Sequence, residues 1–163
     1  MQCGHENTVP GHRVGHDGAV QVAIIYESLT GNTRKASDHI AEELRARGHS
    51  ATAMAADGVD LALLQGADVV VLGTWVHGAF VIGAAPALFK LRNAPAMAGK
   101  RAVVFCTYAL AAGRSLEKFT VAAESLGLTV LGAMLIKRGH LHDGAATLVD
   151  RLLAGLPEAA PVG

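Results

Sequence analysis

Residues 20–33 read VQVAIIYESLTGNT, and this stretch decides the fold. Its first half, up to Tyr26, is a run of apolar and β-branched residues with the length of one strand. Its second half is a short polar loop. Residues 33–47 then carry apolar side chains at helical spacing, and Gly48 follows where a helix end often has glycine. The stretch therefore predicts a strand, a loop and a helix in direct succession.

The same alternation of strand and helix continues along the chain. Further strands are predicted over Ser50–Met54, Ala67–Gly73, Arg101–Cys106 and Thr129–Lys137, and further helices over Val59–Leu64, Pro86–Asn93, Arg114–Leu126 and Asp143–Leu153. The central strands are almost continuously apolar, which is typical of parallel strands buried on both faces. Right-handed crossovers then place helices on both sides of the sheet. The predicted fold is an α/β three-layer sandwich with a five-stranded parallel sheet.

Composition and charge narrow the class of protein. The chain has 163 residues, which suits one domain with a single core. Its 14 basic and 14 acidic residues balance, so no basic surface for a nucleic acid is expected. Cys3 and Cys106 are too few for a disulfide framework and are typical of a reducing compartment, which predicts a cytoplasmic protein. We expect the domain to span residues 20–156, with tails at 1–19 and 157–163 outside the fold.

Two stretches need separate explanations. Val69 to Phe89 contains no Asp, Glu, Lys or Arg and is long enough to suggest a membrane span, but glycines, His77 and Pro86 interrupt it. A strand, a glycine-containing loop and a helix explain it better. Residues 1–19 contain no apolar segment typical of a signal peptide. This tail carries Cys3, His5, His12 and His16, which share no predicted element, so no metal site is expected there.

Three loops follow the strand ends where such sheets bind ligands, namely residues 27–33, 73–78 and 107–113. The first loop packs three hydroxyls and one amide into residues 28–33 and opens into a helix, whose free N–H groups and partial positive charge attract anions. Gly31 allows the backbone to approach a ligand closely. The loop is therefore a candidate phosphate site. A plain turn with a capping Ser or Thr is the alternative.

Other phosphate-binding patterns are not found in the sequence. There is no G-x-x-x-x-G-K-(S/T), which argues against nucleotide triphosphate hydrolysis, and no G-x-G-x-x-G after the first strand. No aspartate ends the third strand and no acidic pair ends the first, which argues against a phosphoacceptor receiver domain.

The residues Ser28-Leu29-Thr30-Gly31-Asn32-Thr33 resemble the (S/T)-x-T-G-x-T phosphate loop of flavodoxins, in the same place after the first strand. The five strand–helix units from Val20 to Leu156 correspond to that family's whole domain, and the uninterrupted last strand is similar to the short-chain type. The resemblance implies a flavodoxin-like fold with strand order 2-1-3-4-5 and one non-covalently bound FMN. It also implies that these six residues hold the FMN phosphate.

The other two loops resemble the loops that surround the flavin ring in flavodoxins. Flavodoxins pack an aromatic residue on one flavin face and often a tyrosine on the other, and Trp75 and Tyr108 stand at these positions. Gly78 resembles the glycine whose peptide turns toward the reduced ring. The residues expected to bind the cofactor there are Thr74, Trp75, Val76, His77, Gly78, Thr107, Tyr108 and Gly113. Trp75 taken alone is more typical of a core or lid residue.

The remaining candidate residues receive structural interpretations. Cys106 ends a buried strand and is expected to be a core residue rather than a nucleophile. His77 lies near where a proton could be delivered, although an exposed loop histidine without a role is commoner. His140 and His142 follow the last strand and are expected to be solvated.

The function implied by the resemblance is electron transfer, with FMN carrying electrons between redox partner proteins. The alternative is an FMN-dependent oxidoreductase of the NAD(P)H:quinone reductase or protoporphyrinogen oxidase type, because the apolar residues 78–83 could form a pocket for a quinone-like substrate. A third hypothesis is a flavin-free interaction domain that keeps the fold. No nucleic-acid partner and no membrane span are expected.

The sequence departs from electron-carrying flavodoxins, which are typically acidic around the flavin. Residues 107–113 contain no Asp or Glu, and the second loop has His77 but no acid. Because nearby negative charge opposes formation of an anionic, fully reduced flavin, we expect a less negative potential for the second one-electron reduction than in acidic flavodoxins. Redox titration of the FMN-loaded protein measures this potential. A value as low as theirs would contradict the expectation.

Overall fold

The structure is a computed structural model that describes residues 18–77, 81–82 and 97–156. Its strands are β1 (Gln21–Tyr26), β2 (Ser50–Ala55), β3 (Val69–His77), β4 (Val81–Ile82), β5 (Arg101–Tyr108) and β6 (Thr129–Lys137). Its helices are α1 (Asn32–Ala46), α2 (Leu61–Gly66), α4 (Ser115–Ser125) and α5 (Leu141–Ala154), with the short 3₁₀ turn η2 (Arg138–His140) before α5. Gly78, the helix predicted over Pro86–Asn93 and most of both predicted tails lie outside the described residues.

Five parallel strands form the sheet in the order β2-β1-β3-β5-β6, and β4 pairs antiparallel with the end of β3. The five parallel strands confirm the predicted order 2-1-3-4-5. β1 lies between β2 and β3, so the direction of strand progression reverses beside it. This reversal is the switch point at which ligands bind in open α/β sheets.

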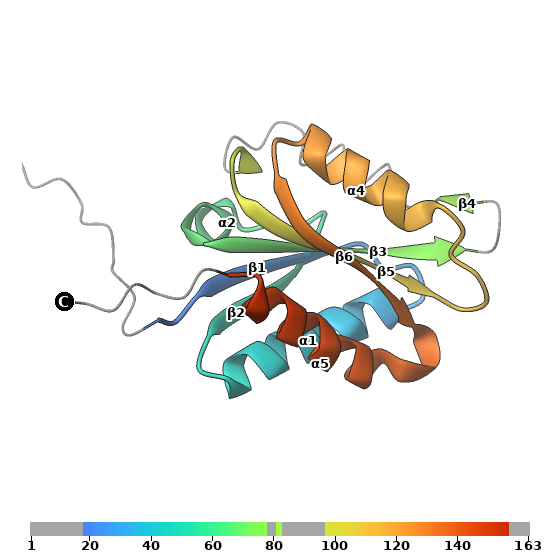
Figure 1. Cartoon of the computed structure of the whole chain (residues 1–163), viewed down its shortest axis with the longest axis horizontal. Helices are drawn as coiled ribbons and strands as arrows, with labels where there is room; N and C mark the ends of the chain where they lie inside the picture. Colours follow the sequence, from blue (N-terminus) through green and yellow to red (C-terminus); the bar gives the residue numbers. More distant parts are fainter. Residues whose placement is uncertain (1–17, 78–80, 83–96, 157–163) are drawn as a thin grey trace, which may run out of the picture.

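Helices cover both faces of the sheet, as Figure 1 shows, with α1 and α5 on one side and α2 and α4 on the other. One buried cluster joins α1 and α5 to the sheet and includes Ile40, Leu44, Phe105, Leu148 and Leu152. A second cluster on the opposite face includes Leu64, Leu72, Val104, Phe119 and Ala123. The apolar face predicted for the helix at residues 33–47 is therefore the face that packs against the sheet.

Two central strands, β3 and β5, are longer than predicted. β3 continues from Gly73 through His77, because Thr74 and Trp75 pair with β5 and the last two residues pair with β4. β5 likewise continues through Tyr108, which pairs with β6. The prediction that residues 73–77 form a loop was wrong, and Thr74, Trp75 and Val76 are residue types that strands favour. Part of the apolar stretch 78–83 is a strand rather than a loop.

The helix boundaries also shift for identifiable reasons. α2 begins at Leu61 rather than Val59 because the Asp60 carboxylate caps it, accepting hydrogen bonds from the backbone N–H groups of Ala62 and Leu63 at 2.9 and 3.1 Å. α5 begins at Leu141, two residues before the predicted start, because η2 leads directly into it. In the part of the chain that the structure describes, no helix is long and apolar enough to cross a bilayer.

Gly73 is required by the packing of the central strands. It is paired with Phe105 of β5, and a Cβ atom at residue 73 would overlap the Phe105 ring, which is fully buried. A close approach of this kind between a strand and an aromatic ring leaves room only for glycine.

We therefore expect Gly73→Ala to lower the free energy of unfolding by about 1–3 kcal/mol, because the added methyl group overpacks a rigid core. Urea unfolding measures the change. Gly132→Ala in β6 is the matched control, since a Cβ atom there meets no neighbour within 4 Å. Equal effects of the two substitutions would contradict the packing argument.

Candidate functional site

The loop between β1 and α1 lies at the carboxyl edge of the sheet, beside the switch point. Tyr26, the last residue of β1, is paired with Gly73 of β3. The backbone N–H of Glu27 then donates to the Gly73 carbonyl at 2.9 Å, which fixes the start of the loop against the neighbouring strand. The parallel pairing therefore holds residues 28–31 directly above the reversal in strand order.

Gly31 forms the turn from this loop into α1. It is the N-cap residue, its φ of 87° lies in the left-handed region, and no side chain caps the helix. The alternative of a turn capped by Ser or Thr is therefore not what the structure shows. Among the described residues, the backbone N–H groups of residues 29–34 have no acceptor, while the Lys35 N–H bonds the Gly31 carbonyl. A Cβ atom at Gly31 would meet nothing within 4 Å, so the space beside this residue is open.

Side-chain hydroxyls of the loop differ in their surroundings. The Ser28 hydroxyl oxygen is buried and has no hydrogen-bond partner among the described residues. The Asn32 side-chain amide donates to the Thr30 hydroxyl at 3.0 Å, and Thr30 itself is exposed. A buried hydroxyl without a partner is unusual in a folded protein and indicates a place for a bound polar group or water.

Thr33 has a different position from the other residues of the predicted phosphate loop. Its side chain is 1% exposed, and its hydroxyl forms a 2.9 Å hydrogen bond with the buried hydroxyl of Thr107 on β5. This bond ties the first turn of α1 to the central sheet. The Thr33 hydroxyl thus serves the fold, and what Thr33 offers to a ligand is its backbone N–H.

The predicted flavin-contacting residues lie on the ends of β3 and β5. Trp75 is half-buried and is paired with Thr107, while Tyr108 is half-buried and packs against the core cluster on the α2–α4 side. Because successive side chains of a strand point to opposite faces, Trp75 and Tyr108 belong to opposite faces of the sheet edge. This placement suits two aromatic groups that flank a ring standing at that edge.

The other predicted contacts are placed as follows. Thr74 and Val76 are buried, and the Thr74 hydroxyl has no hydrogen-bond partner among the described residues. His77 is the last residue of β3. Gly113 is exposed, with a φ of 51°, in the turn before α4. That turn also presents Leu110, which is 94% exposed.

Charges around the site are distributed unevenly. The first turn of α1 contains no acidic residue but has Arg34 and Lys35, both exposed. Arg34 lies 3.9 Å from Asp38 one turn further along the helix. No Asp or Glu occurs between Asp68 and Glu117, a stretch that includes both aromatic candidates. Positive charge at a helix N-terminus is unfavourable unless an anion offsets it.

Glu27 is a residue that the sequence analysis left without a role. It is half-buried, one of its carboxylate oxygens is completely buried, and it directly precedes the loop. It is also the only acidic residue within residues 27–33, 74–77 and 107–113. The sequence feature that could have drawn attention to Glu27 is a carboxylate at the end of an apolar strand, beside a candidate anion site.

Cys106 and the histidines after β6 agree with their structural interpretations. Cys106 is fully buried, and burial raises the pKa of its thiol to about 12, so it is not a nucleophile near neutral pH. His140 and His142 are exposed, as expected. Each nevertheless lies within 4.0 Å of an Asp143 carboxylate oxygen, which the sequence did not indicate.

A doubly wound parallel sheet with this strand order, and with an unsatisfied loop at its switch point, defines the flavodoxin-like class of α/β proteins. The family model for flavodoxin matches residues 24–146, and the chain belongs to this family. A comparison with curated proteins finds no match.

Solved structures show the same fold at low sequence identity. Flavodoxin 2 from Bacillus cereus is 23% identical, with a TM-score of 0.65, over 83% of this chain and 99% of that one. Two-electron reduced flavodoxin from Megasphaera elsdenii is 21% identical, with a TM-score of 0.63, over 79% and 98% of the two chains. A WrbA-like flavodoxin protein from Agrobacterium tumefaciens is 17% identical, with a TM-score of 0.65, over 84% and 98%.

The raised pKa of Cys106 predicts a pH dependence of stability. The unfolded thiol, with a pKa near 9.0, loses its proton at lower pH than the folded thiol, with a pKa of about 12. Above pH 9 the unfolded state therefore binds fewer protons, and the free energy of unfolding falls with rising pH by up to roughly 1.4 kcal/mol per pH unit.

Cys106→Val removes this contribution, so its free energy of unfolding should decrease less steeply across that alkaline range. Urea unfolding at several pH values under reducing conditions compares the two slopes. Parallel slopes would show that burial does not protect the thiol.

Proposed function

We propose that this protein binds one FMN non-covalently and transfers electrons between redox partner proteins. The observation that carries the proposal is the loop at residues 28–34, whose N–H groups have no acceptor in the described part of the chain and whose Ser28 hydroxyl is buried without a partner. A phosphate monoester supplies acceptor oxygens for both kinds of donor. Family membership makes FMN the expected source of that phosphate.

The electrostatics of α1 support a dianion at this place. The helix N-terminus carries partial positive charge, and Arg34 and Lys35 add two formal charges in the same turn. Hydrogen bonds to a charged group contribute roughly 1.5–3 kcal/mol each, so several such donors hold a phosphate without a lysine clamp. In this proposal the phosphate is bound by the side chains of Ser28, Thr30 and Asn32 and by the backbone of residues 29–34, including Leu29, Gly31 and Thr33.

The flavin ring is proposed to lie between the ends of β3 and β5. Trp75 and Tyr108 would contact its two faces, with Thr74, Val76, His77, Gly78, Thr107 and Gly113 around its edges. Aromatic stacking adds about 0.5–1.5 kcal/mol beyond area burial. Bound FMN supplies the redox chemistry, and the protein supplies position, stacking and electrostatics. We place this activity in the cytoplasm, on the basis of cysteine usage.

A second candidate function is an FMN-dependent oxidoreductase that reduces a quinone-like substrate. Leu29 and Leu110 favour it, because they are 62% and 94% exposed in two loops at the carboxyl edge of the sheet. Exposed apolar side chains beside a redox centre suit an apolar acceptor as well as a protein surface. Steady-state NAD(P)H:quinone turnover by the pure protein would establish the enzyme. Reduction of the flavin only through a separate reductase would establish the carrier.

Ser28→Ala provides a direct test of the phosphate site. We expect its FMN dissociation constant to rise about tenfold or more, because one hydrogen bond to a charged oxygen is lost. Calorimetric titration of the flavin-free protein measures the constant. Riboflavin, which has no phosphate, should bind wild type and Ser28→Ala with equal affinity.

Ser125→Ala is the matched control, since Ser125 is exposed at the end of α4 and its hydroxyl bonds only the Val121 carbonyl. Its FMN affinity should be unchanged. If wild type takes up no FMN after incubation with excess cofactor, the proposed function is wrong and the flavin-free interaction domain is favoured. If FMN binds equally well to Ser28→Ala, the loop is not where the phosphate lies.

A further inference from the structure

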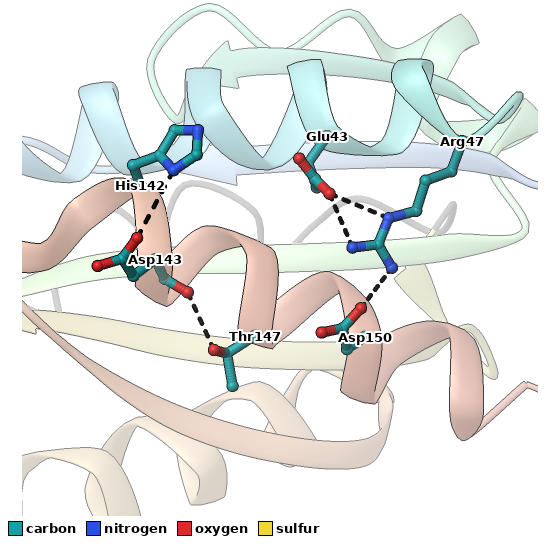
Figure 2. A network of polar contacts seen from close by, with 6 residues as sticks. All are labelled: Glu43, Arg47, His142, Asp143, Thr147 and Asp150. Carbon is teal, nitrogen blue, oxygen red and sulfur yellow. Dashed lines mark hydrogen bonds and ion pairs between the residues drawn. The ribbon is translucent and has the colours of Figure 1, made fainter.

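Helices α1 and α5 lie side by side on one face of the sheet (Figure 1), and side chains join them at two places, of which Figure 2 shows the contact between Arg47 and Asp150. At the end of α1, the Arg47 guanidinium contacts Glu43 of its own helix at 2.7 Å and Asp150 of α5. Nearer the start of both helices, two histidines meet, His39 from α1 and His142 from α5. Their ring centroids lie 5.4 Å apart, with an interplanar angle of 73°.

Each of the two rings has a carboxylate beside the same nitrogen. His39 Nδ1 lies 3.4 Å from Glu42 Oε2, and His142 Nδ1 lies 3.8 Å from Asp143 Oδ1. Figure 2 shows the second of these contacts. Only the Glu42 contact is within hydrogen-bond distance. An ionised carboxylate can only accept, so Glu42 favours the proton on His39 Nδ1 and leaves the Nε2 lone pair of that neutral ring available. Histidine ligands of metals have this arrangement, with a carboxylate behind the non-ligating nitrogen.

The separation of the rings also fits a shared metal ion. With Zn–N bonds of about 2.0–2.1 Å and tetrahedral angles, the centroids of two ligating imidazoles lie roughly 5.2 Å apart. The observed centroid separation of 5.4 Å is close to this value. The side chains of His39 and His142 are 36% and 75% exposed, so an ion can reach both from solvent.

We propose that His39 and His142 bind one divalent transition-metal ion of the Zn²⁺ class through their Nε2 atoms, with Glu42 orienting the His39 ring. Within residues 18–77, 81–82 and 97–156, no three His, Cys, Asp or Glu side chains are already grouped around one ion. Water therefore completes the coordination of this two-imidazole site. Imidazole nitrogen suits Zn²⁺, Cu²⁺ and Ni²⁺ rather than Mg²⁺ or Ca²⁺.

Such a site joins two helices that only the folded chain brings together. The ion therefore binds the native state more tightly than the unfolded state and raises the melting temperature Tm once the free zinc concentration exceeds the dissociation constant. Zinc bound by separate histidines of the N-terminal residues is bound in the unfolded state as well and gives no such rise. This difference separates the proposed site from binding at His5, His12 and His16.

The experiment is thermal unfolding of the full chain after chelator treatment, with and without zinc chloride. We expect zinc to raise Tm of the wild type by several degrees at saturation. His39→Asn and His142→Asn should each remove most of this rise, because asparagine keeps a polar group near the carboxylate but has no Nε2. Each variant is compared with its own zinc-free Tm, so any loss of basal stability does not affect the result.

His140→Asn is the matched control. His140 Nδ1 lies 4.0 Å from an Asp143 carboxylate oxygen, which is similar to the 3.8 Å for His142 Nδ1. Among the described residues, however, the ring that contacts His39 is that of His142 and not that of His140. Both this variant and one with His5, His12 and His16 replaced by Asn should keep the zinc-induced rise. Absence of a rise in wild type, a rise that survives His39→Asn and His142→Asn, or loss of the rise in either control overturns the proposal. No flavin is involved, so the outcome is independent of the proposed function.

Discussion

The left-handed turn at Gly31 is the constraint on which the candidate site depends. β1 is buried on both faces between β2 and β3, so the chain can leave it only at the carboxyl edge of the sheet. It must then reverse within a few residues for α1 to pack back over the same strands. Gly31 makes this reversal with a φ of 87°. The turn leaves a row of N–H groups without acceptors in the described part of the chain, so a polar ligand or water has to satisfy them.

α1 transmits this local geometry to the rest of the molecule. Its buried face includes Ala36, Ile40 and Leu44, which pack on β1 and β3, and Thr33, which bonds Thr107 of β5. Its other contacts reach α5 through His39 and Arg47. The loop before α1 is therefore held from three directions, and the helix cannot shift without disturbing both the sheet and α5. Rigid support of this kind is what a binding loop needs in order to present donors at fixed positions.

The sequence predicted the elements whose side-chain pattern is local. The periodicity of residues 33–47 and the apolar strands were enough for the layers, and the resemblance to flavodoxins supplied the strand order. The end of β3 was missed because its pairing partners are on other segments, and no alternation in Thr74–His77 indicated them. The contact between His39 and His142 was missed for the same reason, since it depends on how α1 packs beside α5. The inward position of the Thr33 side chain could have been predicted from the sequence, because Thr33, Ser37 and Ile40 share one helical face.

At the carboxyl edge of the sheet, the start of α1 and the ends of β3 and β5 differ in charge and in exposed apolar side chains. At the start of α1, Arg34 and Lys35 oppose the helix dipole, so the ligand-free protein carries an electrostatic penalty that a bound dianion removes. In the proposed complex, part of the binding free energy then comes from relief of this repulsion rather than from new contacts alone. At the ends of β3 and β5, by contrast, the sequence from Val69 to Leu116 holds no carboxylate, and Leu110 is almost fully exposed. A partner or substrate that approaches Leu110 meets an exposed apolar side chain and no carboxylate.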